Sequence, residues 1–159
     1  MNLLIRLLYV LILAMFRPRL PAGKARSVLR LVTLPNDLDL NFHMNNGRYL
    51  TLCDLSRVDM FLRTGLVRLM WQRHWAPLIA EHTMVYKSGL RLFDKFELTA
   101  DITHWDEKYF YMAHRFERRG KLVAEGTSKG VIRGREGVIA PEQVLAALLA
   151  QGARRDAGP

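Results

Sequence analysis

Residues 37–49 read Asp-Leu-Asp-Leu-Asn-Phe-His-Met-Asn-Asn-Gly-Arg-Tyr. This stretch follows residues 27–34, a segment rich in valine and leucine that is typical of a strand. It leads into a helix, because apolar residues then recur at three- and four-residue steps. Asn45 or Asn46 suits the N-cap of that helix, and Gly65 suits its C-terminal stop. The stretch therefore joins a strand to the start of a long helix.

The start of a helix is a chemically useful place for such polar residues. It offers unpaired backbone N–H groups and the positive end of the helix dipole, which together stabilise a developing oxyanion. A carboxylate a few residues upstream reaches the same space, as a nucleophile or as a general base for water. Asn and Asp also cap helices and form turns without any catalytic role. Composition alone leaves both interpretations open.

The spacing Asp-x-x-x-His-Met-Asn-Asn-x-x-Tyr, from Asp39 to Tyr49, resembles the signature of a known family. This family is the 4-hydroxybenzoyl-CoA thioesterase branch of the hotdog-fold proteins, and the residues of the motif are most similar to those of the thioesterase superfamily member 6 type. The resemblance covers roughly residues 24–139. It implies an α+β fold in which an antiparallel sheet wraps around one long central helix. That type also has an apolar N-terminal segment.

The resemblance implies hydrolysis of acyl-CoA thioesters, without a cofactor or a metal. Asp39 matches the catalytic carboxylate, and Asp37 occupies the other acidic position of the motif. The backbone N–H of Asn46 matches the amide that polarises the thioester carbonyl. The catalytic residues expected are Asp39, His43 and Asn46, and the substrate-binding residues expected are Asn45, Tyr49, Arg91 and Lys95. Arg91 and Lys95, like Lys87, are chosen as bases in the strand region that suit the phosphates of coenzyme A.

Two other functions stay open. Hydratases of this fold carry Asp-x-Asn-Pro-x-His; Asp39-Leu40-Asn41 begins in that way, but no proline follows and His43 comes one residue early. A non-catalytic protein would hold an acyl chain or acyl-CoA at a membrane surface without turning it over. In addition, Phe42 stands where many relatives have a glycine, so its bulk puts the shape of the pocket in doubt.

Residues 3–16 form an apolar run whose only charge is Arg6. The run is shorter than the roughly 20 residues of a membrane-spanning helix. Arg17 and Arg19 follow it where small residues would mark the cleavage site of a secretory signal. The run is interpreted either as a helix packed on the fold or on a second subunit, or as a helix touching a membrane surface. We expect a cytoplasmic protein, at the cytoplasmic face of a membrane in the second case.

The second half of the chain has the alternating pattern of strands. Residues 82–90, 96–103, 109–117 and 122–133 are the predicted strands, and their short connections indicate an antiparallel meander. Residues 66–80 read as irregular or weakly helical, with a break at Pro77. A short helix is expected over 141–150, followed by a frayed polar tail.

One long helix against one antiparallel sheet is an α+β arrangement. A single helix covers one face of the sheet, so we expect a homodimer or a tetramer. The expected divisions are an apolar N-terminal segment, 1–20, a hotdog domain, 24–139, and a C-terminal helix with its tail, 140–159.

Composition narrows the class further. The chain has 159 residues, half of them hydrophobic, which excludes a disordered chain. Its one cysteine, Cys53, excludes an internal disulfide and any multi-thiolate metal site, and we read it as a small buried residue. The formal charge of +9 favours an anionic partner, but the bases are scattered, so we expect no nucleic acid. The remaining histidines (His74, His82, His104 and His114) lack metal-ligand spacing and are interpreted as structural.

Overall fold

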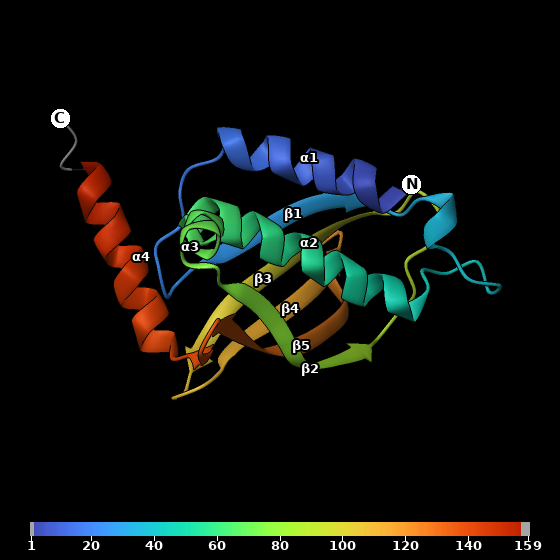
Figure 1. Cartoon of the computed structure of the whole chain (residues 1–159). Coiled ribbons are helices and arrows are strands. Elements are labelled where there is room, and N and C mark those ends of the chain that lie inside the picture. The colour runs from blue at the N-terminus through green and yellow to red at the C-terminus, as the bar shows by residue number, and fades with distance from the viewer. Residues whose placement is uncertain (1, 157–159) are drawn as a thin grey trace.

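One curved antiparallel sheet and the helices that cover it make up the fold (Figure 1). The computed structural model describes residues 2–156. Its elements are α1 (Asn2–Phe16), β1 (Arg26–Val32), the 3-10 turn η1 (Pro35–Asp37), α2 (Asn46–Thr64), α3 (Leu66–Arg73), β2 (Ala76–Tyr86), β3 (Lys95–Trp105), β4 (Phe110–Arg118), β5 (Lys121–Gly134), β6 (Gly137–Ile139) and α4 (Pro141–Asp156).

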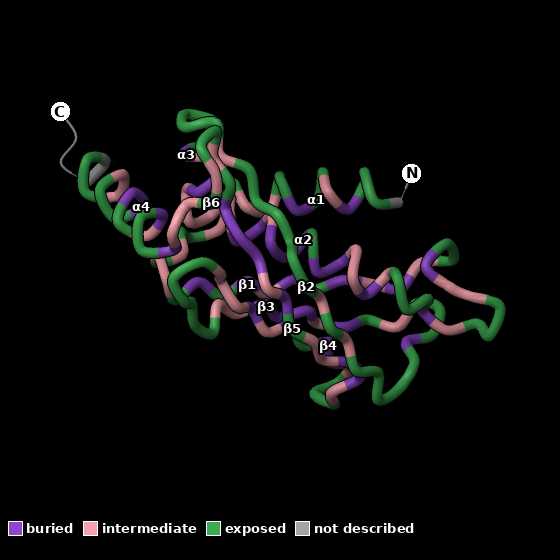
Figure 2. Tube along the Cα trace, turned by 60° about the horizontal axis from the view of Figure 1, so that its bottom comes forward, coloured by how far each residue is buried: buried purple, intermediate pink, exposed green. Residues whose placement is uncertain are grey.

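The strands of the sheet run in the order β1-β3-β4-β5-β2, and each neighbouring pair is antiparallel. The short β6 pairs with β5. The predicted meander is confirmed, since β3, β4 and β5 are consecutive both in sequence and in the sheet. Within the described residues β1 and β2 form the two edges, and Figure 2 shows β2 as largely exposed.

The central helix α2 supplies the middle of the core. Its apolar side, with Leu52 and Leu55, packs against Leu29 of β1, Leu98 of β3 and Phe116 of β4. The N-terminal helix α1 lies across α2 and β1, and its Val10 is fully buried in the same cluster (Figure 1). This arrangement leaves the first turn of α2 at one end of the molecule, next to η1.

A second apolar cluster holds the other end of α2. Gly65, with a φ of 84°, ends α2 in the left-handed conformation that favours glycine, and α3 starts at the next residue. Leu66 of α3 and Val144 of α4 pack in this cluster. The side-chain amide of Gln151 donates to the Gly65 carbonyl at 3.0 Å. The joint between α2 and α3 is therefore fastened to α4.

Several boundaries differ from the sequence prediction. Residues 66–73 form α3, and β2 starts at Ala76 rather than residue 82, because Pro77 lies at the second residue of an edge strand, where a missing N–H is tolerated. β2 ends at Tyr86, so residues 87–90 lie outside it. α4 continues to Asp156, well beyond residue 150, where the Gln151 contact adds to its packing. The short β6 was not predicted.

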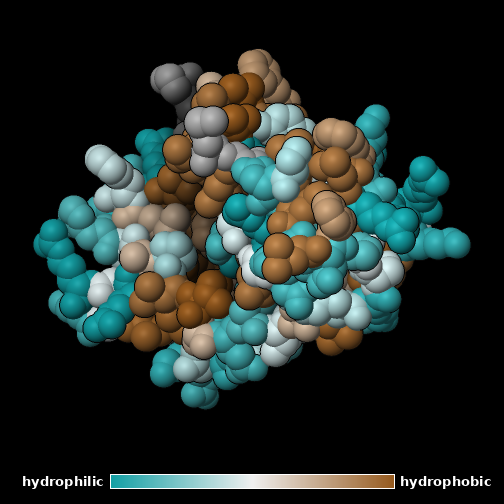
Figure 3. All heavy atoms as spheres, turned by 90° about the vertical axis from the view of Figure 1, so that its right-hand side faces the viewer, coloured by the Kyte–Doolittle hydropathy of each residue, from teal (hydrophilic) through white to brown (hydrophobic). Residues whose placement is uncertain are grey.

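The outer face of α1 is apolar and exposed. Leu4, Ile5 and Leu8 are each more than half exposed, and Met15 and Phe16 are 80% and 83% exposed. Figure 3, which faces the N-terminal end of α1, shows apolar residues gathered at the surface there. Among the described residues, however, no helix has both the length and the apolar character that crossing a membrane requires.

Candidate active site

Residues 38–44 form a narrow hairpin that is closed by a bridge between Leu38 and Met44. The Asp39 N–H donates to the His43 carbonyl at 2.8 Å, and the Phe42 N–H donates to the Asp39 carbonyl at 3.1 Å. Phe42 has a φ of 58°, in the left-handed region that glycine favours. The Phe42 side chain is 77% exposed, away from the pocket described below.

The hairpin orients the Asp39 carboxylate. Its Oδ1 accepts the backbone N–H of Asn41 at 2.8 Å and that of His43 at 3.4 Å. The residue is half-buried. These two backbone donors fix the direction in which the Asp39 carboxylate points.

The first turn of α2 begins directly after the hairpin. The Asn45 side chain caps the helix by accepting the Gly47 N–H at 2.9 Å. Asn46 is the first helical residue, and its carbonyl accepts the Tyr86 hydroxyl at 3.1 Å. This contact ties the helix start to the end of β2.

A pocket of about 280 Å³ opens between the hairpin, the start of α2 and the end of β2. It is lined by Asp39, Asn41, His43, Met44, Asn46, Tyr49, Tyr86, Lys87, Ser88 and Gly89. The structure thus brings together four of the predicted site residues: Asp39, His43, Asn46 and Tyr49. Tyr86, Ser88 and Gly89 belong to no motif that the sequence analysis could recognise, because they reach the pocket only through the fold.

The other three predicted residues lie outside the lining of this pocket. Asn45 acts as the helix cap. Arg91 is exposed, and its main chain forms a bridge with His43. Lys95 lines a different groove of about 370 Å³, together with Arg30 and Arg119.

His43 is placed by close packing. Its ring lies against Gly89, where an added Cβ would come within 2.4 Å of His43 Cδ2. The Met44 N–H donates to the Leu90 carbonyl at 2.7 Å and fixes the same two segments. Residue 89 therefore has room only for a hydrogen atom while the ring keeps this position.

Tyr49 forms the floor beneath the hairpin. It is 1% exposed, and its ring makes edge-to-face contacts with Tyr86 at 5.1 Å and with Phe116 at 4.9 Å. Burial raises the pKa of the Tyr49 phenol, which keeps the hydroxyl protonated at neutral pH.

Asp37, the second acid of the motif, is engaged elsewhere. It is fully buried, and its two carboxylate oxygens accept from Arg6 of α1 at 2.6 and 3.1 Å. Its carboxylate also accepts the Leu34 N–H at 2.8 Å, and its carbonyl accepts the Asn45 N–H at 2.8 Å. Asp37 thus joins α1 to the hairpin, whereas Asp39 faces the pocket.

Residues 33–148 match the family model described as the thioesterase-like superfamily. The chain belongs to the thioesterase-like superfamily. Among curated members, this thioesterase-like chain is 41% identical to protein THEM6 of Xenopus laevis over 85 residues, which are 54% of this chain and 41% of that protein. It is 32% identical to protein THEM6 of Danio rerio over 143 residues, 89% of this chain and 69% of that protein. The chain thus spans less than half the length of the first of these relatives.

Solved structures support the same fold. The probable thioesterase YbaW of Escherichia coli superposes with a TM-score of 0.72 at 20% identity, covering 80% of this thioesterase-like chain and 99% of YbaW. The hypothetical protein SAV2348 of Staphylococcus aureus, solved in complex with CoA, has a TM-score of 0.68 at 17% identity and covers 80% and 84% of the two chains. The predicted α+β hotdog fold with an apolar N-terminal helix is confirmed.

Proposed function

We propose that this chain hydrolyses acyl-CoA thioesters at the pocket beside Asp39. The observation that carries the proposal is the position of one carboxylate: Asp39 lines the same pocket as Asn46, the first residue of α2. A nucleophile or base and a set of oxyanion donors are the two parts that acyl transfer to water needs.

In this proposal each part of the pocket has one task. The thioester carbonyl oxygen lies against the N–H groups that open α2, where the helix dipole favours the developing negative charge. Asp39 either attacks the carbonyl carbon or removes a proton from the attacking water. His43 braces the hairpin that carries Asp39, and Tyr49 closes the floor of the pocket.

The bases near the pocket suit the phosphates of coenzyme A. Lys87 lines the pocket and pairs with Glu125 at 2.7 Å, and Arg91 is exposed beside His43. Lys95, which lines a separate groove, is kept as a proposed contact to these phosphates from outside the pocket. The complex of the structurally similar SAV2348 with CoA supports this choice of thiol carrier.

We also propose that the chain works as a homodimer that pairs through β2. This 11-residue strand is hydrogen-bonded to β5 on one side and exposes Leu78, Ile79 and Val85. A long, exposed, apolar edge strand is a template for pairing with a second chain. Because Tyr86 ends β2 and lines the pocket, the partner would lie close to the site.

The exposed face of α1 favours a second arrangement, in which this end of the protein rests on a lipid surface. Such a face, followed by Arg17 and Arg19, fits an interfacial helix lying on an anionic membrane. A non-catalytic acyl-CoA-binding protein at a membrane is the alternative function that this feature supports.

The test is release of free thiol from a panel of acyl-CoAs by the wild type and by Asp39→Asn. This variant keeps the size of the side chain and removes its charge, so we expect a loss of about 100-fold or more in rate. Asp101→Asn, which changes a surface carboxylate paired with Arg26, is the matched control and should keep full activity.

Each other outcome has a definite meaning. Turnover that survives Asp39→Asn would show that Asp39 is not the catalytic carboxylate. If neither protein turns over any acyl-CoA while both bind it, the function is binding, and vesicle sedimentation becomes the next measurement.

A further inference from the structure

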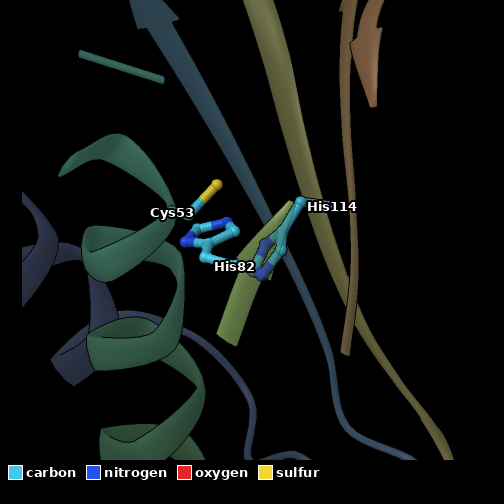
Figure 4. Close-up of side chains that lie close together, drawn as sticks. All are labelled: Cys53, His82 and His114. Carbon is cyan, nitrogen blue, oxygen red and sulfur yellow. The ribbon is translucent and has the colours of Figure 1, made fainter. Parts of the chain in front are cut away.

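A cluster of three potential metal ligands lies in the core, away from the pocket described above. Cys53 extends from α2, His82 from β2 and His114 from β4, and Figure 4 shows the three side chains converging. Their ligand atoms all lie within 4.8 Å of one another. None of the three residues lines the pocket at Asp39, so the cluster has no part in the chemistry proposed there.

The cluster is buried, and some of its ring nitrogens have no hydrogen-bond partner among the described residues. Cys53 and His114 are 0% exposed, and His82 is half-buried. Among the described residues, His114 Nδ1 and His82 Nε2 are buried without a hydrogen-bond partner. Buried polar atoms are nearly always paired, so two such nitrogens beside one thiol call for a ligand.

The far side of the His114 ring contacts Ser128, and Arg57 Nη1 lies 3.4 Å from the same ring nitrogen. Its Nε2 lies 2.6 Å from Ser128 Oγ, which also accepts a hydrogen bond from Arg57 Nη1 at 2.9 Å. In the tautomer that the proposed site requires, Nε2–H donates to this serine oxygen, which has two acceptor sites and accepts Arg57 as well. That tautomer leaves Nδ1 unprotonated toward Cys53 and His82. Histidines that bind metals typically donate their other ring N–H in this way.

We propose that Cys53, His82 and His114 form a binding site for one Cu⁺ ion. The Cys53 thiol loses its proton to solvent as the ion binds, and Cu⁺ accepts the thiolate sulfur and the two unpaired imidazole nitrogens. No electron is transferred in this step. Thiolate and imidazole are ligands that Cu⁺ favours.

Charge and ligand number select Cu⁺ over Zn²⁺. One thiolate, two neutral imidazoles and Cu⁺ have no net charge, whereas Zn²⁺ in the same site leaves a charge of +1. A buried positive charge is unfavourable here because Arg57, itself buried, lies 3.4 Å from His114 Nε2. Arg57 is already paired with Asp54. Zn²⁺ also requires a fourth ligand, while Cu⁺ is satisfied by three.

The ligands have to move together when the ion binds. Around one ion, ligand atoms lie about 3.5 Å apart, given metal–nitrogen and metal–sulfur bonds of about 2.0 and 2.3 Å. His82 is the residue best able to shift, because it is half-buried on the edge strand β2.

The experiment is an anaerobic titration of the purified, reduced full chain with Cu⁺ in competition with bicinchoninate, which is coloured when it holds Cu⁺. The wild type is expected to withhold one equivalent of Cu⁺ from the chelator. Cys53→Ala replaces a small buried residue by another and should weaken binding by about 100-fold or more. His82→Gln and His114→Gln should each weaken it by about tenfold or more.

A matched variant and a second measurement keep the outcome clear. His104→Gln alters a histidine stacked on Tyr111 outside the cluster and should leave Cu⁺ binding unchanged. X-ray absorption of the wild-type complex should show one sulfur and two nitrogen neighbours, which needs no variant to fold. Because Cys53 is the only cysteine, a thiolate signal has one source.

Two results would overturn the proposal. The first is a wild type that withholds no Cu⁺, or a Cys53→Ala variant that withholds as much as the wild type. The second is a parallel titration in which Zn²⁺ binds with dependence on Cys53 while Cu⁺ does not, which would leave the cluster but reject the assigned ion.

Discussion

At the scale of single residues, Gly89 controls the position of His43. An alanine there would place its Cβ 2.4 Å from His43 Cδ2, so the ring has to move. We expect Gly89→Ala to lower kcat/KM for acyl-CoA by about tenfold, since small displacements in an active site are costly. Gly152→Ala, in α4 with open space around it, is the control and should change nothing. Unchanged kinetics in Gly89→Ala would mean that the position of the His43 ring is immaterial.

His114 gives the fold a dependence on pH. Burial, with Arg57 and His82 adding to it, lowers the pKa of His114 to about 3, and burial also lowers the pKa of His82. Unfolding returns both rings to a pKa near 6.5, so below that pH the unfolded state binds more protons. Stability is therefore full above about pH 6.5 and falls toward pH 3 by up to about 1.4 kcal/mol per pH unit for His114, and His82 adds to the loss in the same direction.

Urea unfolding of the metal-free protein at pH 7 and pH 5 measures this loss. His114→Gln should flatten the dependence, whereas His104→Gln should keep it. Equal slopes in the wild type and in His114→Gln would show that His114 is not responsible.

The sequence could predict the local half of the candidate site. Asp39, His43 and Asn46 lie within eight positions of one another, and hairpin geometry and helix capping act over that distance. Tyr86 and Gly89 join the pocket from about 40 positions away, through the pairing of β2 with β5. A short motif does not contain such information. The same reason hides the meeting of Cys53, His82 and His114.

At the scale of elements, α1 is fastened to the hairpin through one buried ion pair, Arg6 with Asp37. Arg6→Met removes one partner and leaves the buried carboxylate with less compensation. We expect a loss of about 3 kcal/mol in unfolding free energy and faster amide exchange in residues 35–45. Arg19→Met, which removes an exposed base just after α1, is the control. An unchanged exchange rate in the hairpin would show that α1 does not hold it.

The boundaries of the elements show what residue patterns miss. Pro77 reads as a break, yet it stands at the second residue of the edge strand β2, where a missing N–H is tolerated. Helix α4 continues past the predicted end, where Gln151 reaches the carbonyl of Gly65. The tertiary surroundings of these residues set both boundaries, and a local sequence pattern does not contain that information. Helix α2, in contrast, was predicted well because its capping residues and periodicity are local.

At the scale of the whole molecule, the free edge of β2 predicts self-association. Light scattering should give at least twice the chain mass of 18.4 kDa. Ile79→Glu replaces an exposed apolar residue of this edge strand by a charge and should weaken the dimer by about tenfold or more. Leu149→Glu, at an exposed position of α4, should not. A wild type that remains monomeric at assay concentrations would contradict the proposed pairing.

The position of α1 also determines where a label or a surface attachment can be placed on the protein. In Figure 1 the start of α1 lies at the same end as η1 and the first turn of α2, while α4 ends on the opposite side. A bulky label or fusion partner placed before α1 would stand at the end of the molecule that carries η1 and the first turn of α2. Immobilisation through the end of α4 keeps the pocket turned toward the solution. It also leaves the apolar face of α1 accessible, so that binding of this face to a lipid surface can be measured on the immobilised protein.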